Sequence, residues 1–145
     1  KTLVQLIDFG SATPIKERIS SSYVQPRYYR APEVMLGMEY DTQVDVWSLA
    51  TTLFELATGG VLFPGGSNNG MIKHMLDICG LFPTSMRSRS AYASKHFNGS
   101  GDFLWRCPKD TDGQEKVLPA KGFEKPPRPI LGQLEAKLAG APESF

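Results

Sequence analysis

The sequence has little cysteine, almost no net charge and no long apolar run. Its two cysteines, Cys79 and Cys107, are too few and too far apart for a zinc site or a disulfide scaffold, so we expect reduced thiols inside a cell. A net charge of +1 gives no reason to expect direct nucleic-acid binding. No stretch suggests a membrane span. What remains is an ordinary globular composition, and 145 residues are enough for one core.

The first part of the chain predicts a short strand followed by a long loop. Residues 2–7 (TLVQLI) alternate well enough for a strand that leads into Asp8. Residues 10–30 contain Gly, Ser, Pro and charges without sustained periodicity. Residues 33–36 predict a short helix that ends at Gly37.

Two longer helices are predicted next. Residues 42–45 (TQVD) fit a capping box, and the apolar residues that follow run at helical spacing to Gly59-Gly60. These residues are Val46, Leu49, Ala50, Leu53, Phe54 and Ala57, with Trp47 and Leu56 on other faces, which predicts a buried helix. Ser67 or Asn68 can cap a second helix that ends at Gly80, with Met71, Ile72, Met75, Leu76 and Cys79 on one face.

From Phe82 onward the sequence shows less hydrophobic periodicity. Periodicity fades between Phe82 and Pro129, which predicts a long and largely irregular insert. Leu131, Leu134 and Leu138 predict a last short helix before Gly140.

Asp8-Phe9-Gly10 directly after a predicted strand is an arrangement that can hold Mg²⁺ on nucleotide phosphates. The aspartate supplies a hard oxygen ligand, the phenylalanine packs behind it, and the glycine allows a sharp turn. Taken alone, the triplet fits a plain turn at a strand end better. The triplet is followed, 23 residues beyond Asp8, by Ala31-Pro32-Glu33, with phosphorylatable residues between them.

These motifs, in this order, resemble the eukaryotic protein kinases. The "DVWSLA" stretch (45–50) matches the buried helix of the kinase large lobe, in which Asp45 would tie to the backbone of the catalytic loop. The resemblance implies a mainly α fold: a partial C-terminal (large) lobe with a short N-terminal β strand and a long irregular insert. It divides the chain into Mg²⁺-binding turn and activation segment (1–33), large-lobe helices (34–80), insert (81–129) and terminal helix with tail (130–145).

The stretch "YVQPRYYRAPE" (23–33) is similar to the CMGC group of kinases. In that group the tyrosine at the place of Tyr23 is phosphorylated, and the arginine at the place of Arg27 pairs with its phosphate. A guanidinium fork meets a doubly charged phosphate with paired hydrogen bonds, which would order this loop. Pro26 departs from the pattern, because the group usually has Ser or Thr there.

Within the group the chain resembles the pre-mRNA-processing factor 4 kinases, through "KTLVQLIDFGSA" (1–12), "LFPGGSNNGMIKHMLD" (62–77) and "KHFN" (95–98). The resemblance implies a serine/threonine kinase that uses ATP and Mg²⁺, acts on spliceosomal protein substrates and is nuclear. It implies neither membrane attachment nor direct nucleic-acid binding.

Several parts of a kinase do not occur in this sequence. It has no glycine-rich phosphate loop, no strand lysine and no His-Arg-Asp catalytic loop, so no catalytic residue is assigned and the chain alone is expected to be inactive. Because it starts at Lys1 without methionine, we expect it to belong to something larger or to be trimmed. The arginine that pairs with Glu33 in the family is also missing, which predicts an exposed Glu33 or a substitute partner. The alternative is a non-catalytic kinase lobe that only binds proteins.

Overall fold

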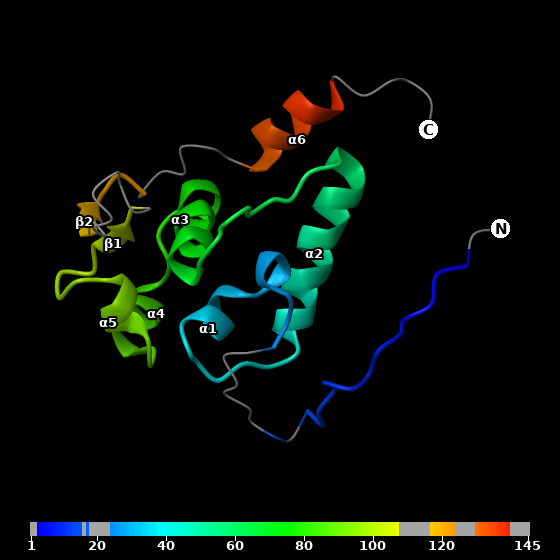
Figure 1. Ribbon diagram of the computed structural model, residues 1–145, viewed down its shortest axis with the longest axis horizontal. Helices are drawn as coiled ribbons and strands as arrows, with labels where there is room; N and C mark the ends of the chain where they lie inside the picture. Colours follow the sequence, from blue (N-terminus) through cyan, green and yellow to red (C-terminus); the bar gives the residue numbers. More distant parts are fainter. Residues whose placement is uncertain (1–2, 16, 18–23, 108–116, 124–129, 140–145) are drawn as a thin grey trace.

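The computed structural model describes residues 3–15, 17, 24–107, 117–123 and 130–139. Helices dominate these residues, and one antiparallel pair of strands completes them (Figure 1). The elements are η1 (Arg27–Tyr29), α1 (Pro32–Met35), α2 (Gln43–Thr58), α3 (Asn68–Cys79), α4 (Thr84–Arg89), α5 (Ala93–His96), β1 (Phe103–Arg106), β2 (Val117–Ala120) and α6 (Ile130–Leu138).

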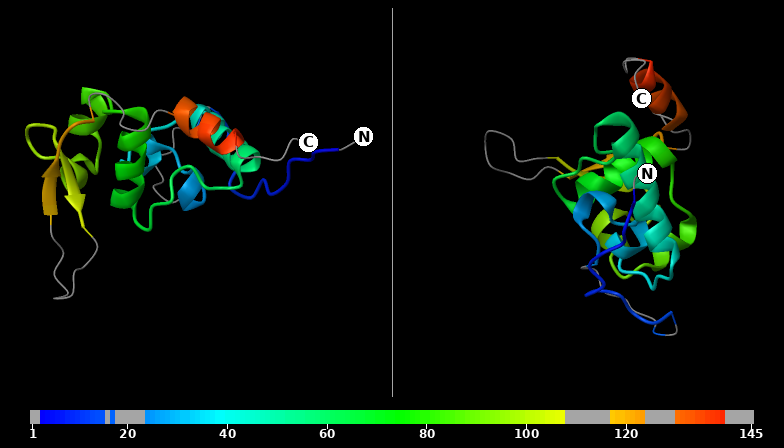
Figure 2. Two further views of the ribbon diagram at one scale, coloured as in Figure 1. Left: turned by 90° about the horizontal axis from the view of Figure 1, so that it is seen from above. Right: turned by 90° about the vertical axis from the view of Figure 1, so that its right-hand side faces the viewer.

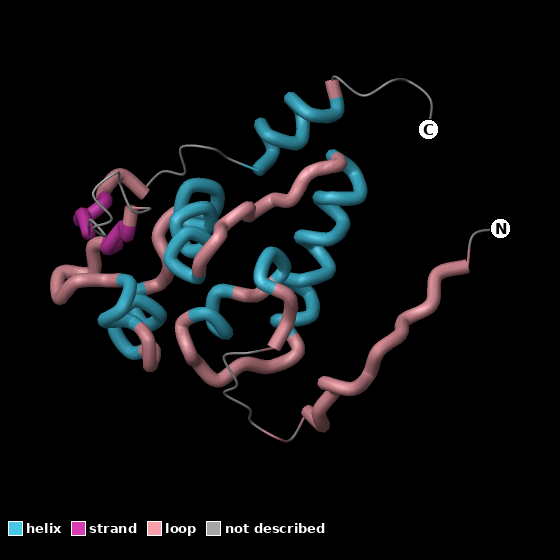
Figure 3. The backbone as a smooth tube through the Cα atoms, in the orientation of Figure 1, coloured by secondary structure: helices cyan, strands magenta, loops and turns pink. Residues whose placement is uncertain are grey.

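The predicted N-terminal strand is wrong for the residues that the structure describes. Residues 3–7 have no strand geometry, and their apolar side chains, such as Leu3 and Ile7, are more than four-fifths exposed. The segment runs apart from the helices (Figure 3). A strand needs a neighbour for its backbone hydrogen bonds, and no described segment pairs with this one.

The helix α2 begins and ends where the sequence predicts, but the predicted capping box is wrong. Thr42 has helical backbone angles and its side chain caps nothing; instead Oδ1 of Asp41 accepts a hydrogen bond from the Gln43 amide at 2.9 Å. At the other end Gly59 takes φ +69°, a left-handed conformation that favours glycine.

The burial predicted for α2 is also wrong. Val46, Leu49, Leu53 and Leu56 are each more than half exposed. The helix packs instead through Val44, Trp47, Thr51 and Phe54, a narrower face with three- and four-residue spacing. Because apolar residues surround this helix, the sequence alone could not show which face turns inward.

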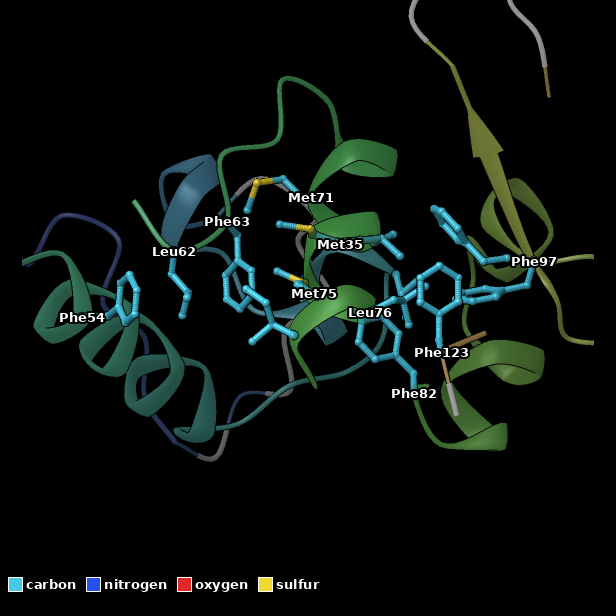
Figure 4. Packing of buried hydrophobic residues seen from close by; sticks show 14 residues of the cluster. Met35, Phe54, Leu62, Phe63, Met71, Met75, Leu76, Phe82, Phe97 and Phe123 are labelled. Atoms are coloured by element: carbon cyan, nitrogen blue, oxygen red, sulfur yellow. The ribbon is translucent and has the colours of Figure 1, made fainter. Parts of the chain in front are cut away.

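The helix α3 lies at the centre, between α2 and the strand pair (Figure 1). Ser67 caps it, since its Oγ accepts the Gly70 amide hydrogen bond at 3.0 Å, and Gly80 follows its last turn, as predicted. Met71, Ile72, Met75 and Leu76 are fully buried, whereas Cys79 is exposed and Ile78 is buried in its place. Figure 4 shows Met71, Met75 and Leu76 of α3 between Phe54, Leu62 and Phe63 on one side and Phe82, Phe97 and Phe123 on the other.

The predicted irregular insert is in fact structured in its described part. It contains α4, α5 and the β1–β2 pair, which lie together at one end of the molecule (Figure 2). Phe103 is fully buried and contacts the rings of Phe97, Trp105 and Phe123. Phe103 and Trp105 lie in β1, whereas Phe97 and Phe123 lie in segments that connect the short elements. The cluster therefore has no single sequence period, and yet it extends the core beyond α3.

The last helix, α6, confirms the prediction of a short helix over Leu131, Leu134 and Leu138. It packs against α2, and Leu134 contacts the edge of the core. Among the described helices, none combines the length and the apolar character that crossing a membrane requires.

Candidate functional site

The segment from Val24 to Ala31 is tied to α2 by the side chain of Gln25. The Gln25 amide donates to the carbonyl of Val44 at 2.7 Å and to Oγ of Ser48 at 2.6 Å, and its Oε1 accepts from the Ala31 amide at 3.0 Å. Oγ of Ser48 in turn donates to the carbonyl of Tyr29 at 2.8 Å. One side chain therefore holds both ends of this segment against the longest helix.

Gln25 itself has a strained backbone, with φ +65°. The buried guanidinium of Arg30 holds that conformation, because it donates to the carbonyl of Gln25 at 2.9 Å and to that of Val24 at 3.0 Å. A left-handed residue that its surroundings fix so completely is typical of a functional segment. Sequence reasoning missed Gln25, since neither its type nor its spacing distinguishes it.

We expect Gln25→Ala to lower the free energy of unfolding by about 2 kcal/mol, because three hydrogen bonds are lost and their partners are partly buried. Gln25→Gly is the matched variant: it loses the same bonds but relieves the left-handed strain, and should be about 1 kcal/mol more stable than Gln25→Ala. Urea unfolding of both variants measures the difference. Equal stability of the two would mean that the φ angle is not strained.

A second contact crosses from this segment to α2. The Tyr29 hydroxyl donates to Oε2 of Glu55 at 2.6 Å. This hydrogen bond, followed by desolvation and by the negative charge of Glu55, raises the pKa of Tyr29. The phenol stays neutral and acts as the donor.

Arg27 follows Gln25 on the exposed side of the segment, and its Nη1 donates to the carbonyl of Gly66 at 2.6 Å. The Gly65-Gly66 turn that presents this carbonyl lies directly against the start of α3. A Cβ on Gly65 would stand 2.3 Å from the backbone nitrogen of Met71, so only glycine fits there. Nothing in the sequence marks this turn as an anchor for Arg27.

Arg27 borders a cavity of about 500 Å³ between the segment, the start of α3 and α5. Arg30, Lys95 and His96 also line it, and none of its described lining residues is acidic. Tyr23, the predicted phosphate acceptor, lies outside the described residues. The predicted pairing of Tyr23 with Arg27 therefore stays a prediction, while the basic surroundings of Arg27 are an observation.

The Asp8-Phe9-Gly10 turn lies apart from this cavity. Asp8 is exposed with φ +64°, and its carboxylate takes part in no hydrogen bond or ion pair with the described residues. Phe9 is 68% exposed rather than packed behind Asp8. No group of three metal-ligating side chains occurs in the part of the chain that the structure describes. Asp8 could supply one ligand to Mg²⁺, and the others would have to come from elsewhere, such as nucleotide phosphates.

Ala31, Pro32 and Glu33 begin α1, where Ala31 and Pro32 are buried. Glu33 is half-buried, so the prediction that it is exposed is wrong. It has no ion-pair partner in the described ranges, and the alternative prediction of a substitute partner stays a prediction. Desolvation, with a smaller contribution from the charge of Asp41, raises its pKa. Asp45, predicted to cap α2, is exposed in the first turn of that helix.

Comparison with known proteins identifies the class. The protein kinase domain family matches residues 1–110, more than half of the chain, so the chain belongs to the protein kinase family. The helix-rich fold with one small antiparallel sheet is part of such a domain.

Two curated relatives narrow the similarity. The chain is 34% identical over 145 residues to "Serine/threonine-protein kinase prp4" of Schizosaccharomyces pombe, an alignment that covers 100% of this chain and 30% of that protein. It is 37% identical over 145 residues to "Serine/threonine-protein kinase prpf4B" of Dictyostelium discoideum, covering 99% of this chain and 18% of that protein. The chain thus spans less than a third of the length of either relative. Both names agree with the resemblance seen in the sequence.

Proposed function

We propose that the chain is most of the large lobe of a serine/threonine protein kinase. The parent transfers the γ-phosphate of ATP to serine or threonine hydroxyls of protein substrates. The observation that carries the proposal is the order of motifs, from Asp8-Phe9-Gly10 to Ala31-Pro32-Glu33, in a chain similar to two named serine/threonine kinases. The names of those relatives support a role in pre-mRNA splicing in the nucleus, on spliceosomal substrates.

In this function Asp8 is the residue of the chain that holds Mg²⁺. Its carboxylate is exposed and pairs with no other described residue, which fits that role. A bound Mg²⁺ neutralises charge on the ATP phosphates during transfer. The hydrogen bonds of Gln25 and Arg30 support substrate positioning. They hold in a single conformation the segment that would lie beside a substrate peptide.

Tyr23 and Arg27 form the proposed switch. Phosphorylation of Tyr23 adds nearly two negative charges four residues before a guanidinium that the Gly66 carbonyl already holds in place. Pairing of the two would order residues 18–30.

We expect phosphorylation of Tyr23 in the intact protein to slow cleavage of residues 18–30 by a protease at least about tenfold, since charged hydrogen bonds stabilise the closed loop. Arg27→Ala should remove this protection. Arg27→Lys, which keeps the charge but loses the fork, should retain only part of it. Limited proteolysis followed by mass spectrometry provides the rate. Equal cleavage with and without the phosphate would contradict the switch.

The rival function is a non-catalytic lobe that binds partner proteins. The exposed apolar residues of α2, Val46, Leu49, Leu53 and Leu56, favour it as a surface. Mg²⁺-dependent ATP binding and peptide phosphorylation by the intact protein separate the two. Their presence supports the kinase, and their absence supports the binding module.

A further inference from the structure

The walls of the cavity beside Arg27 carry positive charge and hydrogen-bond donors, and no acidic side chain occurs among its described lining residues. Its volume is about 500 Å³. Its charged or titratable lining residues are Arg27, Arg30, Lys95 and His96, and Ser67 and Asn68 bring the start of α3 to the same wall. The twelve-residue helix adds a partial positive charge at that end.

Arg27 and Lys95 have donors to spare. A guanidinium has five N–H groups, and the Gly66 carbonyl takes one from Arg27; no other described residue accepts from it. The ammonium of Lys95 lies 4.4 Å from the centre of the Tyr92 ring, which orients it, and it forms no ion pair with any carboxylate in the described ranges.

His96 adds a third donor, and its neighbours determine which ring nitrogen carries the proton. Oδ1 of Asn69 accepts from the Arg106 amide at 2.9 Å, and Nδ2 of Asn69 donates to the Leu104 carbonyl at 2.9 Å. The orientation of the Asn69 amide is therefore fixed. Its Nδ2, 3.1 Å from Nδ1 of His96, must donate to that nitrogen.

Because Nδ1 of neutral His96 is the acceptor, Nε2 carries the hydrogen. His96 as a residue is 7% exposed and lines the cavity, and no described residue accepts a hydrogen bond from Nε2. Among the described residues, only Nε1 of Trp47 is a buried side-chain nitrogen without a partner, so Nε2 of His96 is open to the cavity, where water or an anion can accept its hydrogen.

We propose that this cavity binds a phosphoryl group through Arg27, Lys95 and the Nε2–H of His96. The three donors come from two segments of the chain, one before α1 and one in α5, so the insert becomes part of the site. The proposal deepens the proposed switch and rests on it only for the source of the phosphate. That source is either phosphorylated Tyr23 or a phosphorylated residue of a substrate, and both offer the same chemistry.

The first test measures binding of inorganic phosphate to the intact, unphosphorylated protein by NMR of its histidine ring nitrogens. We expect a saturable shift of the His96 signal, with affinity lowered about tenfold by Lys95→Ala, which removes one charged contact. His96→Asn keeps an acceptor near Nδ1 for Asn69 and removes the Nε2 donor, so phosphate binding, followed by calorimetry, should weaken at unchanged thermal stability. Lys121→Ala, at an exposed lysine outside the cavity, is the control.

Absence of a saturable shift, or equal affinity of Lys95→Ala and Lys121→Ala, would overturn the proposal. If His96→Asn does not fold, the comparison of Lys95→Ala with Lys121→Ala still tests the proposal. The protein phosphorylated at Tyr23 then identifies the source. Loss of phosphate binding there assigns the cavity to Tyr23, and retained binding assigns it to a substrate phosphate. Because these measurements need no catalysis, a failed kinase assay would leave their result intact.

Discussion

Phe103→Ala is expected to lower the free energy of unfolding by about 4 kcal/mol, the largest effect of any substitution argued for this chain. The Phe103 side chain has no exposed surface. Its ring centre lies 5.9 Å from that of Phe97, 6.1 Å from that of Phe123 and 6.4 Å from that of Trp105. Truncation would remove the apolar contacts and leave a cavity that the three neighbouring aromatic side chains cannot close.

Urea unfolding followed by tryptophan fluorescence measures this effect, because Trp105 lies against the ring that is removed. Phe9→Ala is the matched control: the same atoms are deleted from a side chain that is 68% exposed, and the change should stay within about 0.5 kcal/mol. Phe103→Leu should cost less than Phe103→Ala, since most of the volume remains. Equal effects of the two alanine variants would show that the insert is not part of the core.

The elements that the sequence predicts well are those whose ends carry local signals. Ser67 caps α3 and Gly80 ends it, and Gly59 ends α2, each through the backbone geometry of a few adjacent residues. Such signals depend on no distant partner. The motif from Asp8 to Glu33 was visible for the same reason, because it is a matter of residue type and order.

The errors concern contacts between segments far apart in the sequence. The strand expected over residues 2–7 has no neighbour in the described chain, and the inward face of α2 is decided by what packs against it. The insert was expected to be irregular because periodicity fades between Phe82 and Pro129. Phe82, Phe97, Phe103 and Phe123 are spaced without a period, and only the three-dimensional structure brings them into one cluster.

The candidate site shows the same difference between local sequence signals and contacts between distant segments. Arg27 could be found from its motif, but its anchor at Gly66 lies 39 residues away. The clamp by Gln25 depends on Val44 and Ser48, and the donor of His96 depends on Asn69, 27 residues distant. No spacing rule links such pairs, so a single sequence could supply the arginine but not the cavity around it.

Neutral His96 should make the protein more stable at pH 7 than at pH 4. Burial, followed by the positive charges of Arg106 and Lys95, lowers its pKa from 6.5 to about 4. Between these two values the unfolded chain binds a proton at this residue and the folded chain does not, so the free energy of unfolding rises with pH. The contribution of neutral His96 to the free energy of unfolding is fully present above the pKa of the unfolded state. It is lost as the pH falls toward the pKa of the folded state. Over the whole window the change is about 3 kcal/mol.

Unfolding in urea at a series of pH values from 4 to 7, for the wild type and His96→Asn, isolates this contribution. Carboxylates also titrate in the window, and the raised pKa of Glu33 acts in the opposite direction, because a carboxyl that holds its proton longer in the folded state favours folding at low pH. Both proteins share those groups, so only the difference between their curves reports on His96. That difference should change by about 3 kcal/mol across the window, with the wild type losing more stability as the pH falls. Parallel curves would mean that the folded His96 accepts its proton as readily as an unfolded histidine, and that Lys95 and Arg106 do not influence its charge.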